Sequence, residues 1–138
     1  VVIPKSVTTI EECAFLHCCG LETVSLPDAV TRIEAGTFDG CKSLTEINLP
    51  KYVAYIGEAA FRSCEKLERI DLPNSLRTIG NRAFCACGSL KSVVIPKSVT
   101  TIEECAFLHC HDLENIVIPS TVSTIMADAF DGCKFLID

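Results

Sequence analysis

The sequence lacks any long apolar run, although 49% of its residues are hydrophobic. No stretch approaches the roughly 18 to 20 apolar residues that a membrane-spanning helix needs, so we expect no transmembrane segment. The only methionine is Met126, and the chain does not begin with the basic and apolar stretches of a signal peptide. It also contains no Asn-x-Ser/Thr acceptor for N-glycosylation. We therefore expect a segment excised from a longer protein.

Basic residues are also few, with 12 lysines and arginines against 18 aspartates and glutamates and a net charge of −6. An acidic protein repels the phosphate backbone of nucleic acids and the surface of anionic membranes. We therefore expect no nucleic-acid partner and no membrane insertion. Neutral or basic proteins are the partners that this charge allows.

The residue combinations that support catalysis are missing as well. The sequence has no phosphate-binding glycine loop, its serines recur as turn residues, and its three histidines have no carboxylate or nucleophile partner within the repeat described below. An enzyme also needs an irregular pocket, which nearly identical coils without an insertion do not build. We therefore expect neither an enzyme nor a bound cofactor.

The sequence does contain an internal repeat of 23 residues, which is the main signal of its architecture. Proline, phenylalanine, cysteine and leucine each recur at this step, with no drift in the interval. The four columns are Pro4, Pro27, Pro50, Pro73, Pro96 and Pro119; Phe15, Phe38, Phe61, Phe84, Phe107 and Phe130; Cys18, Cys41, Cys64, Cys87, Cys110 and Cys133; and Leu21, Leu44, Leu67, Leu90, Leu113 and Leu136. Six whole repeats fill residues 1–138, so we expect one solenoid domain without capping repeats.

A single repeat, such as residues 21–43, predicts two extended segments followed by a tight turn. The first segment ends at Pro27, which has no backbone N–H to continue a hydrogen-bonded ladder. Val30 and Ile33 form the second, and a small residue beside Phe38 marks the turn. One repeat cannot bury its own apolar face, so neighbouring repeats must stack on it. We therefore expect a mainly β solenoid with a parallel strand ladder on the concave face. Short extended segments and tight turns should form the convex side.

The run from Leu44 to Pro50, followed by Val53, Ile56, Ala60, Phe61 and Cys64, resembles the BspA-like leucine-rich repeats. The resemblance covers the whole chain. It implies a leucine-rich repeat solenoid of a cell-surface or secreted protein, in bacteria or protists, that adheres to matrix proteins or other host surfaces. Many members place glycine after the isoleucine, as Gly57 and Gly80 do, but other repeats here have glutamate or methionine. We therefore expect no positive φ at that position.

Ten cysteines in a short chain suggest a disulfide scaffold, but their positions favour another interpretation. Six of them form the regular column, where a small and weakly polar side chain fits a buried turn. We expect these thiols to be buried and reduced, with bridges between neighbouring column members as the alternative. The other four, Cys13, Cys19, Cys85 and Cys105, lie outside the column. We expect them to be exposed or partly exposed, and to be the first to oxidise.

Four neighbouring residues, Cys105, His109, Cys110 and His111, offer the ligand types that zinc takes. Their spacing matches no standard zinc motif, and Cys110 belongs to the inward column. An earlier copy of the same segment has Cys19 in place of His111. We therefore expect no metal site.

The outward positions of the first extended segment vary from repeat to repeat, and this is the usual binding face of a solenoid. The candidate binding residues are Ser25, Glu46, Asn48, Arg69, Asp71, Lys91, Val94, Asn115 and Val117. The simpler alternative is that they are only solvated strand residues. Val94 beside Val117 favours a contact patch, because adjacent apolar side chains on an exposed sheet often mark an interface. We expect a protein partner, either a matrix or host-surface protein or another copy of this chain.

Residues 1–18 are identical to residues 93–110, and residues 38–42 match residues 130–134. Identity at outward positions such as Lys5 and Lys97 indicates recent block duplication, or an engineered or assembled sequence, because packing constrains only inward positions. The last residues followed by the first would complete one more strand of the repeat. Two explanations remain open: a fragment of a longer array, which we favour, or a protomer that assembles end to end into a filament or tube.

Overall fold

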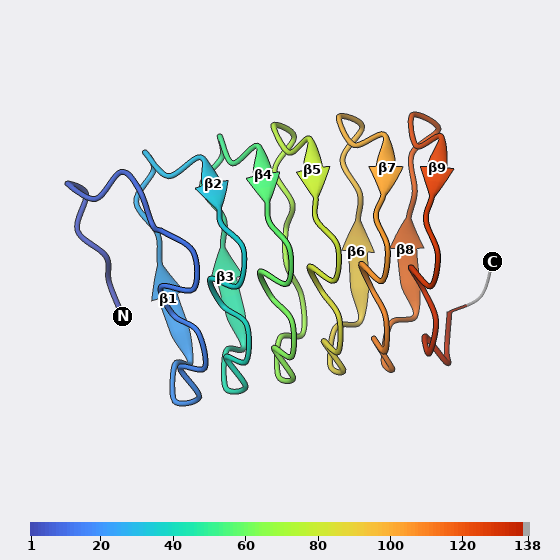
Figure 1. Ribbon diagram of the computed structural model, residues 1–138, viewed down its shortest axis with the longest axis horizontal. Coiled ribbons are helices and arrows are strands. Elements are labelled where there is room, and N and C mark those ends of the chain that lie inside the picture. Colours follow the sequence, from blue (N-terminus) through green and yellow to red (C-terminus); the bar gives the residue numbers. More distant parts are fainter. Residues whose placement is uncertain (137–138) are drawn as a thin grey trace.

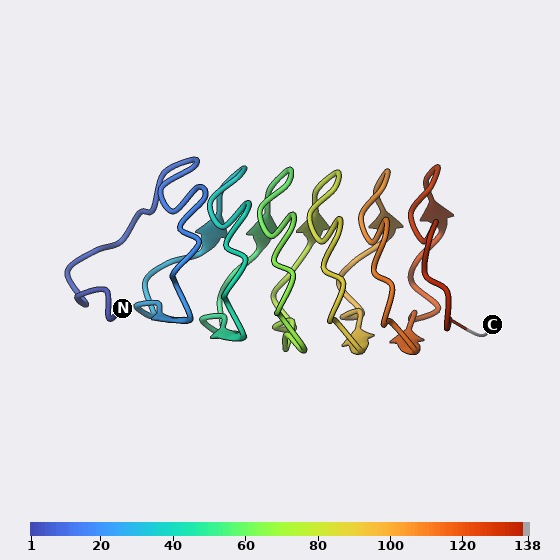
Figure 2. The same cartoon turned by 90° about the horizontal axis from the view of Figure 1, so that it is seen from below.

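The computed structural model describes residues 1–136 and contains only short strands, with no helix among those residues. The coils follow one another along the long axis of the molecule (Figures 1 and 2). The strands are β1 (Thr23–Ser25), β2 (Arg32–Ile33), β3 (Glu46–Asn48), β4 (Tyr55–Ile56), β5 (Thr78–Ile79), β6 (Ser92–Val94), β7 (Thr101–Ile102), β8 (Asn115–Val117) and β9 (Thr124–Ile125). All their pairings are parallel, which confirms the predicted solenoid. The predicted end of the array, at residue 138, lies outside the described residues.

The first extended segment of each repeat forms what we call the first ladder, in which β1 pairs with β3 and β6 pairs with β8. The ladder is interrupted at residues 69–71, which join their neighbours through a single bridge between Arg69 and Ser92. Ile70, at the centre of this segment, is still buried with the core. The predicted ladder is therefore correct in position but broken into two paired regions.

The second extended segment of each repeat also pairs with its equivalents in neighbouring coils. The sequence predicted that this segment is extended but did not predict its pairing. β2, β4 and β5 form one sheet, and β7 pairs with β9. We call these pairs the second ladder. Its strands point in the opposite direction to those of the first ladder (Figure 1). Ile33, Ile56 and Ile79 occupy the inward positions and are almost fully buried.

The turn of each coil adds a third line of hydrogen bonds between coils. Amides at alternate positions donate to carbonyls 22 residues later, for example Phe61 N–H to Ala83 O at 2.8 Å and Ser63 N–H to Cys85 O at 2.8 Å. Two residues per coil adopt positive φ at fixed positions, and only three of the twelve are glycine. The positions are Cys13, Gly36, Ala59, Arg82, Cys105 and Asp128, and His17, Gly40, Ser63, Ala86, His109 and Gly132. Cooperative pairing of the turns therefore holds side-chain-bearing residues in a conformation that normally favours glycine.

Gly57 and Gly80 are not among the positive-φ residues, as the sequence led us to expect. Their role is close approach of the backbone. A Cβ on Gly57 would lie 2.6 Å from the backbone nitrogen of Ala35, and one on Gly80 would lie 2.7 Å from that of Glu58. Glycine therefore lets two neighbouring coils come together at this point.

The core is built from columns that run through the stack. The phenylalanine rings stack with centroids 5.3 to 5.6 Å apart and planes within 13° of parallel. The thiol of each column cysteine from Cys41 to Cys133 donates to the carbonyl of the phenylalanine 26 residues earlier, at 3.1 to 3.2 Å. Because burial disfavours the thiolate, the pKa of Cys41 is raised to about 11 and that of Cys87 well above its usual value. The thiols from Cys41 to Cys133 are thus hydrogen-bond donors that link one coil to the next.

The four cysteines outside the column do not behave alike, although all ten are free thiols. Cys13 and Cys19 are exposed, as expected. Cys85 and Cys105 are buried, with exposed fractions of 9% and 5%, so the expectation of exposure was wrong for this pair. Both sit in interior coils, where the stack covers the turn from both sides.

Candidate functional site

The candidate binding residues lie on the outer surface of the first ladder. In β1, β3 and β6 the central side chain is buried and the two flanking ones are exposed, because successive side chains of a strand point to opposite faces. All nine candidates are exposed. Strand pairing brings Ser25 beside Asn48, Ser92 beside Asn115, and Val94 beside Val117.

Val94 and Val117 form the apolar part of this surface. They are paired in register between β6 and β8, with exposed fractions of 61% and 55%. Cβ atoms of directly opposed strand residues lie roughly 5 Å apart, so the two side chains make one continuous apolar strip. Leaving such a pair in water is unfavourable, and contact with a partner would remove it from solvent.

Two depressions meet at Val94. One, of about 230 Å³, lies on the side of the ladder interruption and is lined by Arg69, Ile70, Asp71, Leu72, Ser92 and Val94. The other, of about 560 Å³, lies over the following turn and is lined by Asn74, Val94, Ile95, Pro96, Lys97, Ser98 and Pro119. Leu72, Asn74 and Ile95 were not among the sequence-based candidates. Their contribution depends on spacing between coils, which a repeat pattern does not specify.

The charged candidates are not neutralised by one another. The ion pairs among residues 1–136 join Arg32 to Glu34 and Arg62 to Asp39, both away from the first ladder. Arg69 and Asp71 flank the smaller depression, and Lys91 precedes β6. The surface therefore presents an apolar strip with charges of both signs at its border, which is the usual anatomy of a protein interface.

On the outer surface of the second ladder, neighbouring charged and aromatic side chains contact one another. Arg32 donates to both carboxylate oxygens of Glu34, at 3.0 and 3.3 Å, and its guanidinium lies 4.0 Å from the centre of the Tyr55 ring. These groups already satisfy one another. The second ladder is consequently a weaker candidate for binding than the first.

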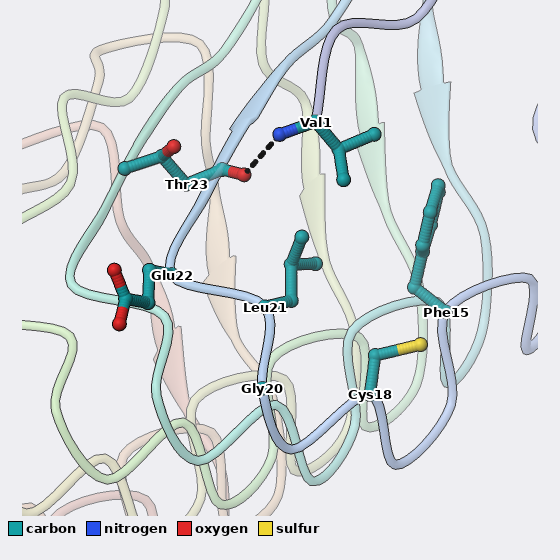
Figure 3. Close-up of a pocket in the computed structure, with 7 residues that line it drawn as sticks. All are labelled: Val1, Phe15, Cys18, Gly20, Leu21, Glu22 and Thr23. Atoms are coloured by element: carbon teal, nitrogen blue, oxygen red, sulfur yellow. Dashed lines mark hydrogen bonds between the residues drawn. The ribbon is translucent and has the colours of Figure 1, made fainter.

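A third hollow lies on the outer side of the first coil, lined by Val1, Phe15, Cys18, Gly20, Leu21, Glu22 and Thr23 (Figure 3). The terminal amine of Val1 donates to Thr23 O at 3.1 Å on one side of it. Phe15 and Cys18 are core-column residues whose equivalents in interior coils, such as Phe38 and Cys41, are fully buried. The hollow therefore lies where the core columns meet solvent at the first coil, and its lining does not distinguish it as a binding site.

The cysteines and histidines considered as zinc ligands are separated by burial. Cys105 and Cys110 are buried, and the Cys110 thiol donates a hydrogen bond to the Phe84 carbonyl oxygen at 3.1 Å. His109 and His111 remain exposed at the surface. Within residues 1–136, no three cysteine, histidine, aspartate or glutamate side chains come together to form a site with three or more protein ligands.

The regular columns and their geometry are those of a known repeat family. The family sequence model named BspA type Leucine rich repeat region matches residues 8–137 of this chain in six copies. The chain belongs to this family. Its fold is of a kind that is typically non-catalytic and engages other proteins. No curated protein matches the chain, and no helix in the part of the chain that the structure describes is long and apolar enough to cross a membrane.

Three solved bacterial structures illustrate the similarity. A leucine-rich repeat protein from Bacteroides ovatus is 36% identical, with a TM-score of 0.95 over 98% of this chain and 35% of its own. A leucine-rich repeat protein from T. pallidum is 32% identical, with a TM-score of 0.82 over all of this chain and 78% of its own. A leucine rich cell surface protein from Faecalibacterium prausnitzii is 30% identical, with a TM-score of 0.80 over 99% of this chain and 46% of its own. The chain thus spans about a third of the B. ovatus protein and under half of the F. prausnitzii protein.

Proposed function

We propose that the chain is a non-catalytic protein-binding and adhesion module, and that it binds through the outer surface of the first ladder. The observation that carries this proposal is the exposed, in-register pair of Val94 and Val117 beside two depressions. Its candidate contacts are Ser25, Glu46, Asn48, Arg69, Asp71, Lys91, Val94, Asn115 and Val117. An apolar centre with a charged border fits the surface of another folded protein.

We also propose that this surface acts outside the cell, on an extracellular matrix or host-surface protein. The name of the F. prausnitzii relative, a cell surface protein, supports this location. The net charge of −6 favours neutral or basic partners over anionic ones. Family membership supports a binding role without naming the ligand.

The test is a comparison of two double variants in binding to immobilised extracellular matrix proteins and to cultured cells. Val94→Lys with Val117→Lys places two charges on the apolar strip, and we expect at least a tenfold loss of affinity. Thr78→Lys with Thr124→Lys places the same charges on exposed positions of the second ladder and serves as the matched control. Circular dichroism should show both variants folded. Equal binding by the two variants would contradict the proposal.

Self-association is the competing outcome, since the partner could be a second copy of this chain. Light scattering across a range of concentrations, with electron microscopy of the same samples, separates the two. Monomers that bind matrix proteins support adhesion. Filaments or tubes that persist in the Val94→Lys, Val117→Lys variant would instead indicate assembly through another part of the coil.

A further inference from the structure

Two exposed histidines lie side by side on the turn of the fifth coil. The ring centroids of His109 and His111 are 5.7 Å apart, and the ring planes are tilted by 35°. His109 has a φ of 60°, one of the left-handed positions of the turn. The buried thiol of Cys110 lies between them in sequence and points into the core, which leaves both imidazoles on the surface.

Gly132 of the next coil fixes how these two rings are oriented. A Cβ at Gly132 would lie 2.6 Å from Nδ1 of His109, so a larger residue at position 132 would displace this ring from its observed position. The Nδ1 of His111 lies 3.2 Å from the Gly132 carbonyl oxygen. A carbonyl oxygen can only accept, so Nδ1 of His111 carries the proton and Nε2 holds the free lone pair. A backbone carbonyl that orients the second ring nitrogen is the usual outer partner of a metal-binding histidine.

The duplicated first coil repeats this arrangement with a related pair of residues. His17 occupies the position of His109 and packs against Gly40, while Cys19 occupies the position of His111. The Cys19 thiol faces the Gly40 carbonyl oxygen at 3.8 Å, in the way that Nδ1 of His111 faces the Gly132 carbonyl oxygen at 3.2 Å. The other four coils have no such pair at the same two positions: Gly40 and Lys42, Ser63 and Glu65, Ala86 and Gly88, and Gly132 and Lys134. Metal-ligand residue types therefore occur together only where the following coil supplies the glycine.

From this geometry we propose that His109 and His111 chelate one divalent transition-metal ion of the imidazole-binding class, such as Zn²⁺, Ni²⁺ or Cu²⁺, through their Nε2 atoms. With metal–nitrogen bonds of about 2.0 to 2.1 Å, two imidazoles on a tetrahedral ion have centroids about 5 Å apart. The observed 5.7 Å requires only a small rotation of exposed rings. Water, or a side chain of a bound partner, completes the coordination, because no third protein ligand is nearby within residues 1–136.

The equivalent pair His17 and Cys19 is a second, mixed site that binds soft ions in preference, since thiolate favours Zn²⁺ over Ni²⁺. This difference makes Ni²⁺ the sharper probe of the two-histidine site. The sequence argued against a metal here because Cys110 faces the core and the spacing is unusual. Cys110 does face the core, but the two imidazoles lie outside it, and their ring centroids are 5.7 Å apart despite the unusual spacing.

The experiment titrates Ni²⁺ into the reduced 138-residue chain by isothermal titration calorimetry, with NMR of the histidine rings as a second readout. We expect saturable binding of one ion per chain, with shifts of the His109 and His111 ring signals. His111→Gln and His109→Gln should each abolish this binding, while His17→Gln, which alters the equivalent position of the first coil, should leave it intact. Circular dichroism verifies that each variant is folded.

A gain-of-function variant tests whether the same two residues create a site in the first coil. Cys19→His gives the first coil the same residues as the fifth, and we expect the number of bound Ni²⁺ ions to rise from one to two. Binding that survives in both the His109→Gln and His111→Gln variants would overturn the proposal, as would the absence of saturable Ni²⁺ binding to the unaltered chain. Neither result depends on whether the first ladder binds a protein.

Discussion

Residues 1–18 and 93–110 have the same sequence but not the same environment. Phe107, Val99 and Cys110 of the second copy are fully buried, whereas Phe15, Val7 and Cys18 of the first are only partly buried. The local backbone is nevertheless the same, since Cys13 and Cys105 have φ values of 59° and 57°. In this fold, conformation is set by the repeat, and burial is set by the coils on either side.

The largest test of this comparison is deletion of the phenylalanine side chain in each copy. Phe107→Ala should lower the free energy of unfolding by about 3 to 5 kcal/mol, because it leaves a cavity in the middle of the ring stack. Phe15→Ala should cost roughly half as much, since its ring stacks on one side only. Urea denaturation followed by circular dichroism measures both. Equal costs would show that burial in the stack is not what determines the contribution of the ring.

The comparison also explains how much the sequence could predict. The 23-residue period identified the inward columns, the buried cysteine column, the parallel ladder and the exposure of all nine candidate residues. It could not predict the burial of Cys85 and Cys105, because a period distinguishes inward from outward positions but not how tightly neighbouring turns cover an intermediate one. The interruption at residues 69–71 also depends on distances between coils.

The geometry of the candidate binding surface was predictable in the same partial way. Alternation along the strand placed Val94 and Val117 on one exposed face, and the structure pairs them in register. The depressions beside Val94 involve Leu72 and Asn74 from one coil and Ile95 from the next, and these residues carry no signal of their own in the sequence. The histidine pair was visible as residue types, but its orientation by Gly132 required the next coil to be in place.

A second test uses the reactivity of the duplicated cysteines. Cys13 is exposed and Cys105 is 5% exposed, although both are followed by the same five residues. Iodoacetamide should modify Cys13 roughly a hundredfold faster, because Cys105 reacts only after local opening of the stack. Mass spectrometry of timed digests separates the two sites, whose peptides differ downstream. In urea, the two cysteines should be modified at equal rates, which serves as the reference. Similar modification rates in the native chain would mean that the interior turn opens freely.

The smallest expected effect separates backbone conformation from packing within one turn. Ser63 has a φ of 59° and is partly exposed, whereas Ala60 on the same turn is fully buried and has no positive φ. Ser63→Gly should raise the free energy of unfolding by about 0.5 to 1 kcal/mol, since glycine adopts positive φ without strain. Ala60→Gly should lower it by about 1 kcal/mol or more, as a buried methyl group is lost and the chain gains freedom when unfolded. Thermal unfolding measures whether each variant gains or loses stability. A loss of stability in both variants would contradict the account of the turn.

The hydrogen bonds between coils give the array an unusual freedom in length. Each thiol of the cysteine column from Cys41 to Cys133 bonds a carbonyl 26 residues earlier, and alternate turn amides bond carbonyls 22 residues later. Gain or loss of one complete 23-residue unit therefore preserves every remaining bond, whereas gain or loss of a single residue disrupts several at once. Evolution can consequently vary the separation between two surface sites, such as the pairs at residues 17 and 19 and at 109 and 111, only in increments of one coil. Natural variation in this protein should thus consist of whole units and surface substitutions, with almost no intermediate lengths.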